Sequence, residues 1–492
     1  MNSLPSIHHV NRVLMALAAL SGIVLTAGCG SSNNSIPPLG GGFTKTSLSG
    51  QYVIAQTGIG AVQPPLTGIA PFSETIVLTA DGKGALNVTV DDFDQVGGPF
   101  TLTAPMAGTY NVGSDGTGFL AFNGSNYALT MIDDSHFNVI EQDLFATASG
   151  FGEKQDTSAF TLAPAGNFVF KAHNIDFSSR VGGINITAGV ISGNEDVLNL
   201  GTLSSPQAVA SSISMSAPDS NGRGTFALTD GTSSNYYVVN SSKFHFMSNS
   251  NSGSLEIGQA EMQTGAFSLA TLANNNAYVF GSSGDTSNPL GIHSAGVFTV
   301  DGAGNVTAGG AVDYVQDATV NSNLVVSGGN YTLAASGRGT LNLTLAGGTI
   351  SPEIFWMVNG TRAYFLANST LAVEDGTFSL QTGAPFTALS SQATFVMDGF
   401  DVAYKDRVGV FKPTTAGFDW NQAANSFDVN LGGNPSATGT SGTYTVGANG
   451  RATVIVNNVA SNLVLYLSSP NTGFMVQEDA DIGGSFTQQA SQ

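Results

Sequence analysis

The sequence is poor in the residues that carry charge and covalent cross-links. A single cysteine occurs in 492 residues, so no disulfide can form within the chain and packing must hold the fold together. Lys and Arg number 14 against 34 Asp and Glu. Affinity for nucleic acid depends on clustered cations, so this balance argues against a nucleic-acid partner. Only 10% of residues are charged and 41% are apolar, which predicts a folded rather than a disordered chain.

The N-terminal segment has the features of an export signal. Arg12 precedes an apolar run at 13–25, which is shorter than the roughly 20 residues that a membrane-spanning helix needs. Two small residues then stand directly before Cys29, the one cysteine, although Thr26 replaces the commoner leucine. This pattern resembles the lipobox of bacterial lipoproteins. The resemblance implies a signal peptide at 1–28 and diacylation of the Cys29 thiol.

Residues 29–45 are rich in Gly, Ser, Asn and Pro, a composition typical of a flexible tether. By resemblance to enterobacterial lipoproteins, an aspartate after the acylated cysteine signals retention in the inner membrane, but Gly30 stands there. We therefore expect an exported protein anchored at the outer membrane through acylated Cys29. The sequence leaves open which leaflet of the outer membrane holds the anchor.

Beyond the tether the sequence repeats with a period of about 110 residues. Each unit opens with an aromatic residue among apolar ones, at Tyr52, Phe168, Tyr278 and Phe395. Each unit later contains a turn that ends in glycine, at Gly116, Gly222, Gly337 and Gly450. We predict four units, at 46–156, 157–264, 265–382 and 383–492.

Within a unit, apolar and polar residues alternate with the period of two that a half-buried strand requires, as at Leu341, Leu343 and Leu345. Helical periodicity is absent after residue 28. Asp-Gly and Asn-Gly pairs between the runs supply the positive backbone angles of tight hairpins. In unit one, about eight runs of roughly five to seven residues are centred near Tyr52, Ile76, Leu86, Leu102, Tyr110, Phe119, Ala128 and Phe137. The pattern predicts an all-β chain of tandem antiparallel units with about eight short strands each.

Three architectures fit eight strands per unit. A small barrel and a two-sheet sandwich are equally compatible with the pattern. If each unit is two four-stranded blades, the four units close one β-propeller instead. Asp-Gly turns at Asp81 and Asp301 alternate with Arg-Val-Gly at Arg180 and Arg407, so pairing of the units is a further alternative.

Unit three carries the repeat most clearly, in residues 298–305, at Tyr331 and in residues 337–340. This repeated residue pattern resembles that of glycine-rich repeat lipoproteins of environmental bacteria such as Acidobacteria. The resemblance implies a β-protein of the surface or periplasm and implies no activity.

No catalytic motif stands out. The G-x-S-x-G elbow of hydrolases is missing, and Gly82-Lys83 is followed by Gly84 where a phosphate-binding loop needs Ser or Thr. We therefore expect a protein that is not an enzyme and has no cofactor. The histidines after the signal lack metal-ligand spacing and are expected to be ordinary strand or loop residues: His136, His173, His245 and His293.

Two acidic groups, which we expect in loops, are candidates for Ca²⁺, a cation that prefers oxygen ligands. Neither has EF-hand spacing, and the alternative interpretation is that they are solvated loop charges. The residues are Asp91, Asp92 and Asp94 in one group and Glu478, Asp479 and Asp481 in the other.

Arginine follows the repeated turn glycine in three units, at Arg223, Arg338 and Arg451. A guanidinium fork can bind an anionic glycan or a lipid headgroup. The alternative is that each arginine closes its hairpin by bonding backbone carbonyls or a neighbouring carboxylate. Trp420 is the candidate for an exposed sugar-stacking platform, whereas Trp356 lies in an apolar run and is expected in a core.

Together these features predict a lipid-anchored cell-envelope β-repeat protein with a structural, adhesion, glycan-binding or protein-binding role. One alternative is a carrier that holds a small apolar ligand inside its barrels. Another is an enzyme acting on extracellular polysaccharide, which would need a pair of carboxylates in a groove.

Overall fold

The computed structural model describes residues 42–490, apart from 63–67, 96–97, 103–104, 144–145, 175–176, 200–201, 250–254, 273–274, 287–290, 347–351, 369–371, 390, 401–403, 414–416, 421–426, 432–433, 438–440, 457–461 and 479. The predicted signal peptide, Cys29 and nearly all of the predicted tether lie outside these residues. No helix in the described part is long and apolar enough to cross a membrane. Its helices are three short 3-10 turns: η1 (Lys45–Ser47), η2 (Thr157–Thr161) and η3 (Leu269–Thr271).

The first barrel closes because β1 pairs with both β2 and β9, while β2 also pairs with β3. A short strand, β4 (Phe100–Leu102), lies beside β3 outside the circuit. The eight strands of the circuit are β1 (Ser49–Ala61), β2 (Ile69–Asp81), β3 (Ala85–Gln95), β5 (Met106–Val112), β6 (Thr117–Phe122), β7 (Ser125–Asp133), β8 (His136–Gln142) and β9 (Ala146–Lys154).

The second and third barrels are closed circuits of eight consecutive antiparallel strands. Barrel 2 contains β10 (Gly166–Asn174), β11 (Ser178–Thr187), β12 (Val190–Asn199), β13 (Thr202–Ile213), β14 (Arg223–Leu228), β15 (Ser233–Asn240), β16 (Lys243–Ser248) and β17 (Glu256–Met262). Barrel 3 contains β18 (Asn276–Thr286), β19 (Ile292–Val300), β20 (Asn305–Gln316), β21 (Thr319–Leu333), β22 (Arg338–Leu345), β23 (Pro352–Asn359), β24 (Arg362–Asn368) and β25 (Ala372–Leu380).

The fourth barrel closes through the pairing of β26 with β27 and carries a two-stranded ribbon, β29 (Phe427–Leu431) and β30 (Asn434–Ala437), on the edge of β27. Its circuit contains β26 (Ala393–Phe400), β27 (Lys405–Pro413), β28 (Phe418–Trp420), β31 (Ser441–Val446), β32 (Arg451–Val456), β33 (Asn462–Ser469), β34 (Thr472–Gln477) and β35 (Asp481–Gln488). The prediction of an all-β chain of tandem antiparallel units is thus confirmed. The units are barrels, not sandwiches or propeller blades.

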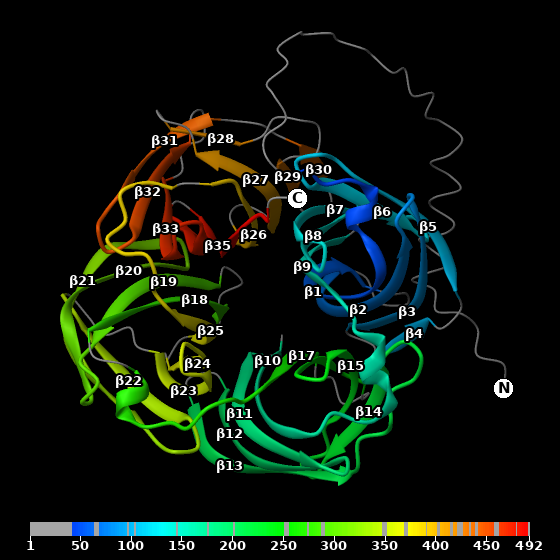
Figure 1. Ribbon diagram of the computed structural model, residues 1–492, viewed down its shortest axis with the longest axis horizontal. Coiled ribbons are helices and arrows are strands. Elements are labelled where there is room, and N and C mark those ends of the chain that lie inside the picture. Colours follow the sequence, from blue (N-terminus) through cyan, green and yellow to red (C-terminus); the bar gives the residue numbers. More distant parts are fainter. Residues whose placement is uncertain are drawn as a thin grey trace.

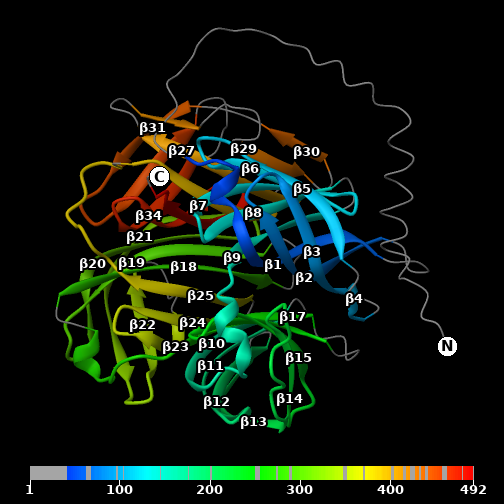
Figure 2. The same ribbon diagram turned by 45° about the vertical axis from the view of Figure 1, so that its right-hand side comes forward.

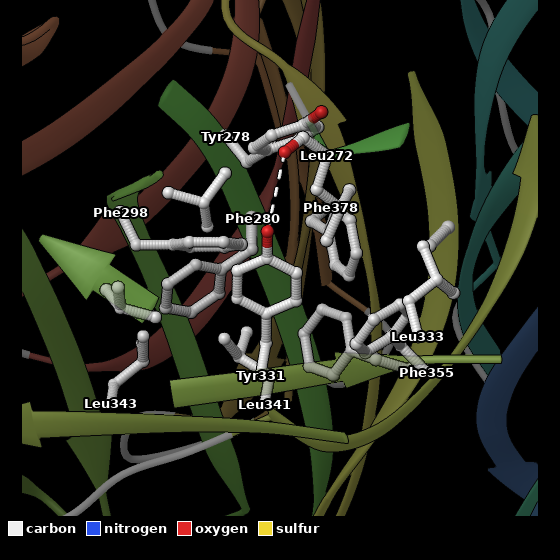
Figure 3. Close-up of a cluster of buried hydrophobic side chains, with 14 of the residues drawn as sticks. Leu272, Tyr278, Phe280, Phe298, Tyr331, Leu333, Leu341, Leu343, Phe355 and Phe378 are labelled. Carbon is white, nitrogen blue, oxygen red and sulfur yellow. Dashed lines mark hydrogen bonds between the residues drawn. The ribbon is translucent and has the colours of Figure 1, made fainter. Parts of the chain in front are cut away.

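Side chains fill the barrel interiors. In barrel 3, Figure 3 shows Tyr278, Phe298, Phe355 and Phe378 packed together, with the rings of Phe355 and Phe378 5.2 Å apart. Clusters of buried apolar residues occupy the other three barrels in the same way. Because packed side chains take up this space, the interiors do not support the alternative of a carrier with a ligand inside each barrel.

Many of the strand glycines make room for these aromatic rings. Gly339 lies opposite Phe355 on the neighbouring strand, and Gly152 lies opposite Phe137. A Cβ atom added to Gly339 would sit 2.2 Å from Phe355 Cζ and 2.3 Å from a backbone oxygen. Part of the high glycine content therefore lets aromatic rings lie flat against adjacent strands.

The substitution Gly339→Ala should destabilise the protein by about 1–3 kcal/mol, because the added methyl group would overpack a core that is already closely packed. Gly360, also in barrel 3, is the control, since its added Cβ would lie 3.8 Å from the nearest side-chain atom. Urea unfolding of both variants measures the difference. Equal stability of Gly339→Ala and Gly360→Ala would contradict the packing argument.

The four barrels form a ring, as both views show (Figures 1 and 2). Apolar clusters join barrel 1 to barrel 2, barrel 2 to barrel 3 and barrel 3 to barrel 4. A fourth and smaller cluster joins barrel 4 back to barrel 1. Each barrel thus packs on two neighbours, and the ring does not divide into two separate pairs.

Candidate functional site

Each of the three repeat arginines binds an aspartate of the preceding barrel, in a contact that we call the interbarrel clasp. The guanidinium fork of each arginine holds the carboxylate at two atoms. The pairs are Arg223 with Asp92 (2.7 Å), Arg338 with Asp196 (2.7 Å) and Arg451 with Asp313 (2.6 Å). The anion-binding interpretation of these arginines has no support here, because their charge is used within the ring. The alternative of a bond to a carboxylate holds, with the correction that the carboxylate belongs to the preceding barrel, so that the contact joins two barrels and does not close a hairpin.

An aromatic side chain completes each clasp. Trp356 donates from Nε1 to Asp196 Oδ2 at 2.8 Å, and Tyr237 and Tyr466 donate their hydroxyls to the other two aspartates. Each aromatic residue lies directly across the strand pair from the arginine. Burial opposes ionisation of Asp313, but the hydrogen bonds from Arg451 and Tyr466 hold its pKa below the ordinary value. The clasps are thus buried ion pairs with satisfied hydrogen bonds.

The acidic group at 91–94 was expected in a loop, and this prediction is wrong. Asp91, Asp92 and Asp94 lie on β3 and are buried, with 1–2% of their surface exposed. Burial raises the pKa of Asp94 to about 7. The run contains neither glycine nor proline, so nothing interrupts the strand.

The second acidic group is divided. Glu478 lies in the turn between β34 and β35, where it accepts a hydrogen bond from Ser322. Asp481 begins β35, is buried and accepts from the Ala318 amide at 2.8 Å, and Asp479 lies outside the described residues. Among the described residues, no three His, Cys, Asp or Glu side chains are grouped so that they could hold a metal ion. The Ca²⁺ hypothesis gains no support.

The two tryptophans lie in different barrels, Trp356 on β23 of barrel 3 and Trp420 on β28 of barrel 4. Trp356 is buried between barrels 2 and 3, as its apolar sequence context predicted. Trp420 lies on β28, but its side chain is outside the described part, and its role as a sugar platform stays a prediction.

A glutamine after the last strand of each barrel binds the repeated turn of a neighbouring barrel. Its amide nitrogen donates to two backbone carbonyls, one of them directly before the turn glycine. The donors are Gln155 to Asn221 and Val238, Gln263 to Ser336 and Met357, Gln381 to Asn449 and Leu467, and Gln489 to Asp115 and Met131. The last of these joins barrel 4 to barrel 1 and closes the ring.

The interface between barrels 4 and 1, which we call the closing seam, has no clasp at the repeated position. Thr117 replaces the arginine and binds Asp115 of its own turn, while Thr130 replaces the aromatic residue across the strand pair. Thr130 contacts Thr394 of barrel 4 through the two hydroxyls. The seam therefore lacks an arginine clasp and is joined by side-chain hydrogen bonds and a small apolar cluster.

A cavity of about 800 Å³ lies between the four barrels. The walls come largely from the first and last strands of every barrel, among them β1 and β9, β10 and β17, β18 and β25, and β26 and β35. Many of the wall residues are Gly, Ser and Thr, with charged side chains between them. We call this space the axial cavity, and it exists only because the ring closes.

Barrels 2 and 3 meet at the cavity in a network of charged side chains. Asp375 accepts from Lys171 at 2.9 Å, and His173 lies 3.0 Å from Asp375 and 2.9 Å from Asp285. Burial opposes protonation of His173, but the two carboxylates raise its pKa to about 10. His173 is therefore an imidazolium at neutral pH and cannot serve as a general base. Ser179, 2.9 Å from His173 Nδ1, is fully buried and donates to Asp375, so it is not placed as a nucleophile.

Barrel 4 contributes two carboxylates, Asp398 and Asp406, to the wall of the axial cavity. Burial raises the pKa of Asp398, and it raises the pKa of Asp406 to about 7. Asp406 accepts from the Thr147 hydroxyl across the closing seam. His293 also lines the cavity, and burial lowers the pKa of its imidazole.

This cavity was not predicted from the sequence. His173 and His293 were expected to be ordinary strand residues, and they do lie on β10 and β19. What sets them apart is their position on strands that face the axis, which depends on the docking of barrels far apart in the chain. The signal available in the sequence was the presence of charged residues, such as Lys171 and Asp375, on the first or last strand of a barrel.

The described chain is a closed ring of four tandem eight-stranded antiparallel β-barrels. No protein-family model matches the sequence, and no curated protein matches it. Among solved structures, a point mutant of transferrin binding protein B from Haemophilus parasuis Hp5, described as a vaccine antigen, covers 70% of this chain and 78% of its own at 8% identity, with a TM-score of 0.20. The isotype 1 transferrin binding protein B of serogroup B Neisseria meningitidis covers 67% and 75% at 7% identity, also with a TM-score of 0.20.

Proposed function

We propose that the chain is a lipid-anchored binding protein of the cell envelope, in which a tether holds a ring of β-barrels off the membrane. The observation that carries the binding role is the axial cavity, a space of about 800 Å³ walled by all four barrels. Volumes of about 300–1,000 Å³ are typical of small-molecule sites. Closure of the ring fixes the walls before a ligand arrives, which lowers the entropic cost of binding.

The sequence supports the anchor. Cys29 stands at the end of the export signal, and residues 30–41 have the composition of a flexible tether. The predicted end of the tether at residue 45 is too late, because Phe43 is already buried in the core of barrel 1. After cleavage the chain would carry 13 Lys and Arg against 34 Asp and Glu. This charge keeps the ring away from anionic lipid headgroups and favours a cationic ligand over an anionic one.

The substitution Cys29→Ser should move the protein from the membrane fraction to the soluble fraction of the envelope, because diacylation of the thiol is the proposed attachment. Fractionation of the producing cells and mass spectrometry of the mature N-terminus measure this change. Ser31→Ala is the control, since it alters the tether but leaves the cysteine in place. Continued membrane retention of Cys29→Ser would overturn the anchor assignment.

A further inference from the structure

The charged side chains of the axial cavity are not balanced around its wall. On the side of barrels 2 and 3, Lys171 pairs with Asp375 at 2.9 Å and Arg362 pairs with Glu261 at 2.8 Å. On the barrel 4 side, within the described residues, no lysine or arginine pairs with Asp398 or Asp406. A carboxylate in such a position is costly to ionise without a counterion.

An imidazole lies near Asp398 in the same wall. His293 lines the cavity with 5% of its surface exposed, and its Nδ1 has no hydrogen-bond partner among the described residues. Because its pKa is lowered, the imidazole is neutral near pH 7 and retains a nitrogen that can accept a hydrogen bond. The wall thus offers two carboxyl groups that pair with no lysine or arginine among the described residues, together with a neutral acceptor.

Aromatic side chains accompany this group. Phe151, Tyr404 and Phe474 line the same cavity, and Phe151 is 43% exposed. Carboxylates together with aromatic rings are a chemistry that recognises ammonium groups, through charge and through the negative face of the ring.

We propose that the axial cavity binds a small organic ammonium compound of the polyamine class, with Asp398 and Asp406 as counterions and His293 as a hydrogen-bond acceptor. This inference rests on the proposed binding function and names its ligand class. A polyamine suits the site because its separated ammonium groups can reach both carboxylates, while its methylene segments lie along the glycine-rich wall.

Binding should depend on pH. Asp398 is faced by His293, His173 and Asp285, and Asp406 is faced by Asp398 and by the hydroxyls of Thr147 and Ser149. An ammonium group binds the ionised carboxylates, so affinity should rise as pH rises through the raised pKa of about 7 of Asp406. For one such group the ionised fraction, and with it the affinity, increases roughly tenfold between pH 6 and pH 8.

Isothermal titration of the mature chain, made soluble by Cys29→Ser, with spermidine tests the proposal. The expected result is one site per chain, with affinity at least about tenfold weaker in Asp398→Asn and in Asp406→Asn. Asp419→Asn is the matched control, because Asp419 is an exposed residue of the same barrel outside the cavity wall. The asparagine variants resemble the protonated acids and should keep the wild-type fold, which circular dichroism checks.

Three results would overturn the proposal. The first is a failure of spermidine to bind. The second is an affinity for spermidine that neither asparagine variant changes. Equal binding of a neutral diol of similar length, or of Ca²⁺ alone in place of spermidine, would show that the site does not select ammonium. None of these results bears on membrane attachment through Cys29, so the anchor is tested separately.

Discussion

The substitution Asp313→Ala is expected to destabilise the ring by about 3–5 kcal/mol, the cost of breaking a buried ion pair by removing one partner. The carboxylate accepts from both sides of the Arg451 guanidinium, at 2.7 and 2.6 Å, and from the Tyr466 hydroxyl. It also accepts from the Asn323 amide at 2.7 Å. Alanine would remove the acceptor of Arg451 Nε and of the Tyr466 hydroxyl at the interface between barrels 3 and 4, and would leave Arg451 Nη2 with only Ser322 at 3.3 Å and Glu478 at 3.5 Å.

Denaturant unfolding of the soluble mature chain measures the effect. Asp301→Ala is the control in the same barrel, because Asp301 is a partly exposed turn residue that accepts from the amides of Ala303 and Asn305, and it should cost only about 1 kcal/mol. The double variant Asp313→Leu with Arg451→Met should recover most of the lost stability, since an apolar pair leaves no uncompensated charge. A loss in Asp313→Ala no larger than that in Asp301→Ala would show that the clasp does not hold the ring.

Half of each clasp could be predicted from the sequence. Arg223, Arg338 and Arg451 stand out because they follow the same turn in a chain with few cations. Their aspartates do not stand out, since Asp92 is 131 residues from Arg223 and lies in a different sequence context from Asp196. The local sequence pattern identifies the turn and its arginine, whereas the aspartate that the arginine binds is determined by how one barrel docks on another.

The strands show the same limit. The apolar runs near Tyr52 and Ile76 mark β1 and β2, but each strand is 13 residues long, where five to seven were expected. Polar residues continue these strands, and two of them, Gln56 and Glu74, are buried and hydrogen-bond each other at 2.5 Å. Strand β9 was not predicted, because Ala146–Lys154 has small residues at the positions where an apolar run would mark a strand. One of them, Gly152, has no side chain because the ring of Phe137 occupies that space.

The cavity was beyond the reach of sequence reasoning for a further reason. Lys171, His173 and Asp375 read as isolated polar residues in strands, and a polar residue on a strand is ordinarily solvated. They become a site because the first and last strands of each barrel face the ring axis. That arrangement needs a closed ring, and closure depends on the seam between barrels 4 and 1.

The closing seam should be the joint at which the ring opens, and Gln489→Ala should open it. The Gln489 amide donates at 2.8 Å to the carbonyls of Asp115 and Met131 in barrel 1. Without Gln489 the Met131 carbonyl loses this donor, while the Asp115 carbonyl keeps Gln392 at 3.3 Å, so the loss should cost about 1–3 kcal/mol, a factor of at least about five in the population of the open ring. Strands β26 and β27 pack along β7, β8 and β9, but barrels 4 and 1 are not consecutive in the chain. The apolar cluster of the seam has four buried residues against nine between barrels 2 and 3, and Thr117 supplies no clasp.

Gln381→Ala is a matched control for this prediction. Gln381 makes the same two bonds, at 2.9 and 2.7 Å, from barrel 3 to barrel 4. There the chain itself links the two barrels and the Arg451 clasp remains, so separation is opposed by a high effective concentration. Small-angle X-ray scattering of the soluble mature chain should show a larger radius of gyration for Gln489→Ala alone. Expansion of both variants, or of neither, would mean that the seam is no weaker than the other joints, and that the axial cavity is as permanent as the barrels around it.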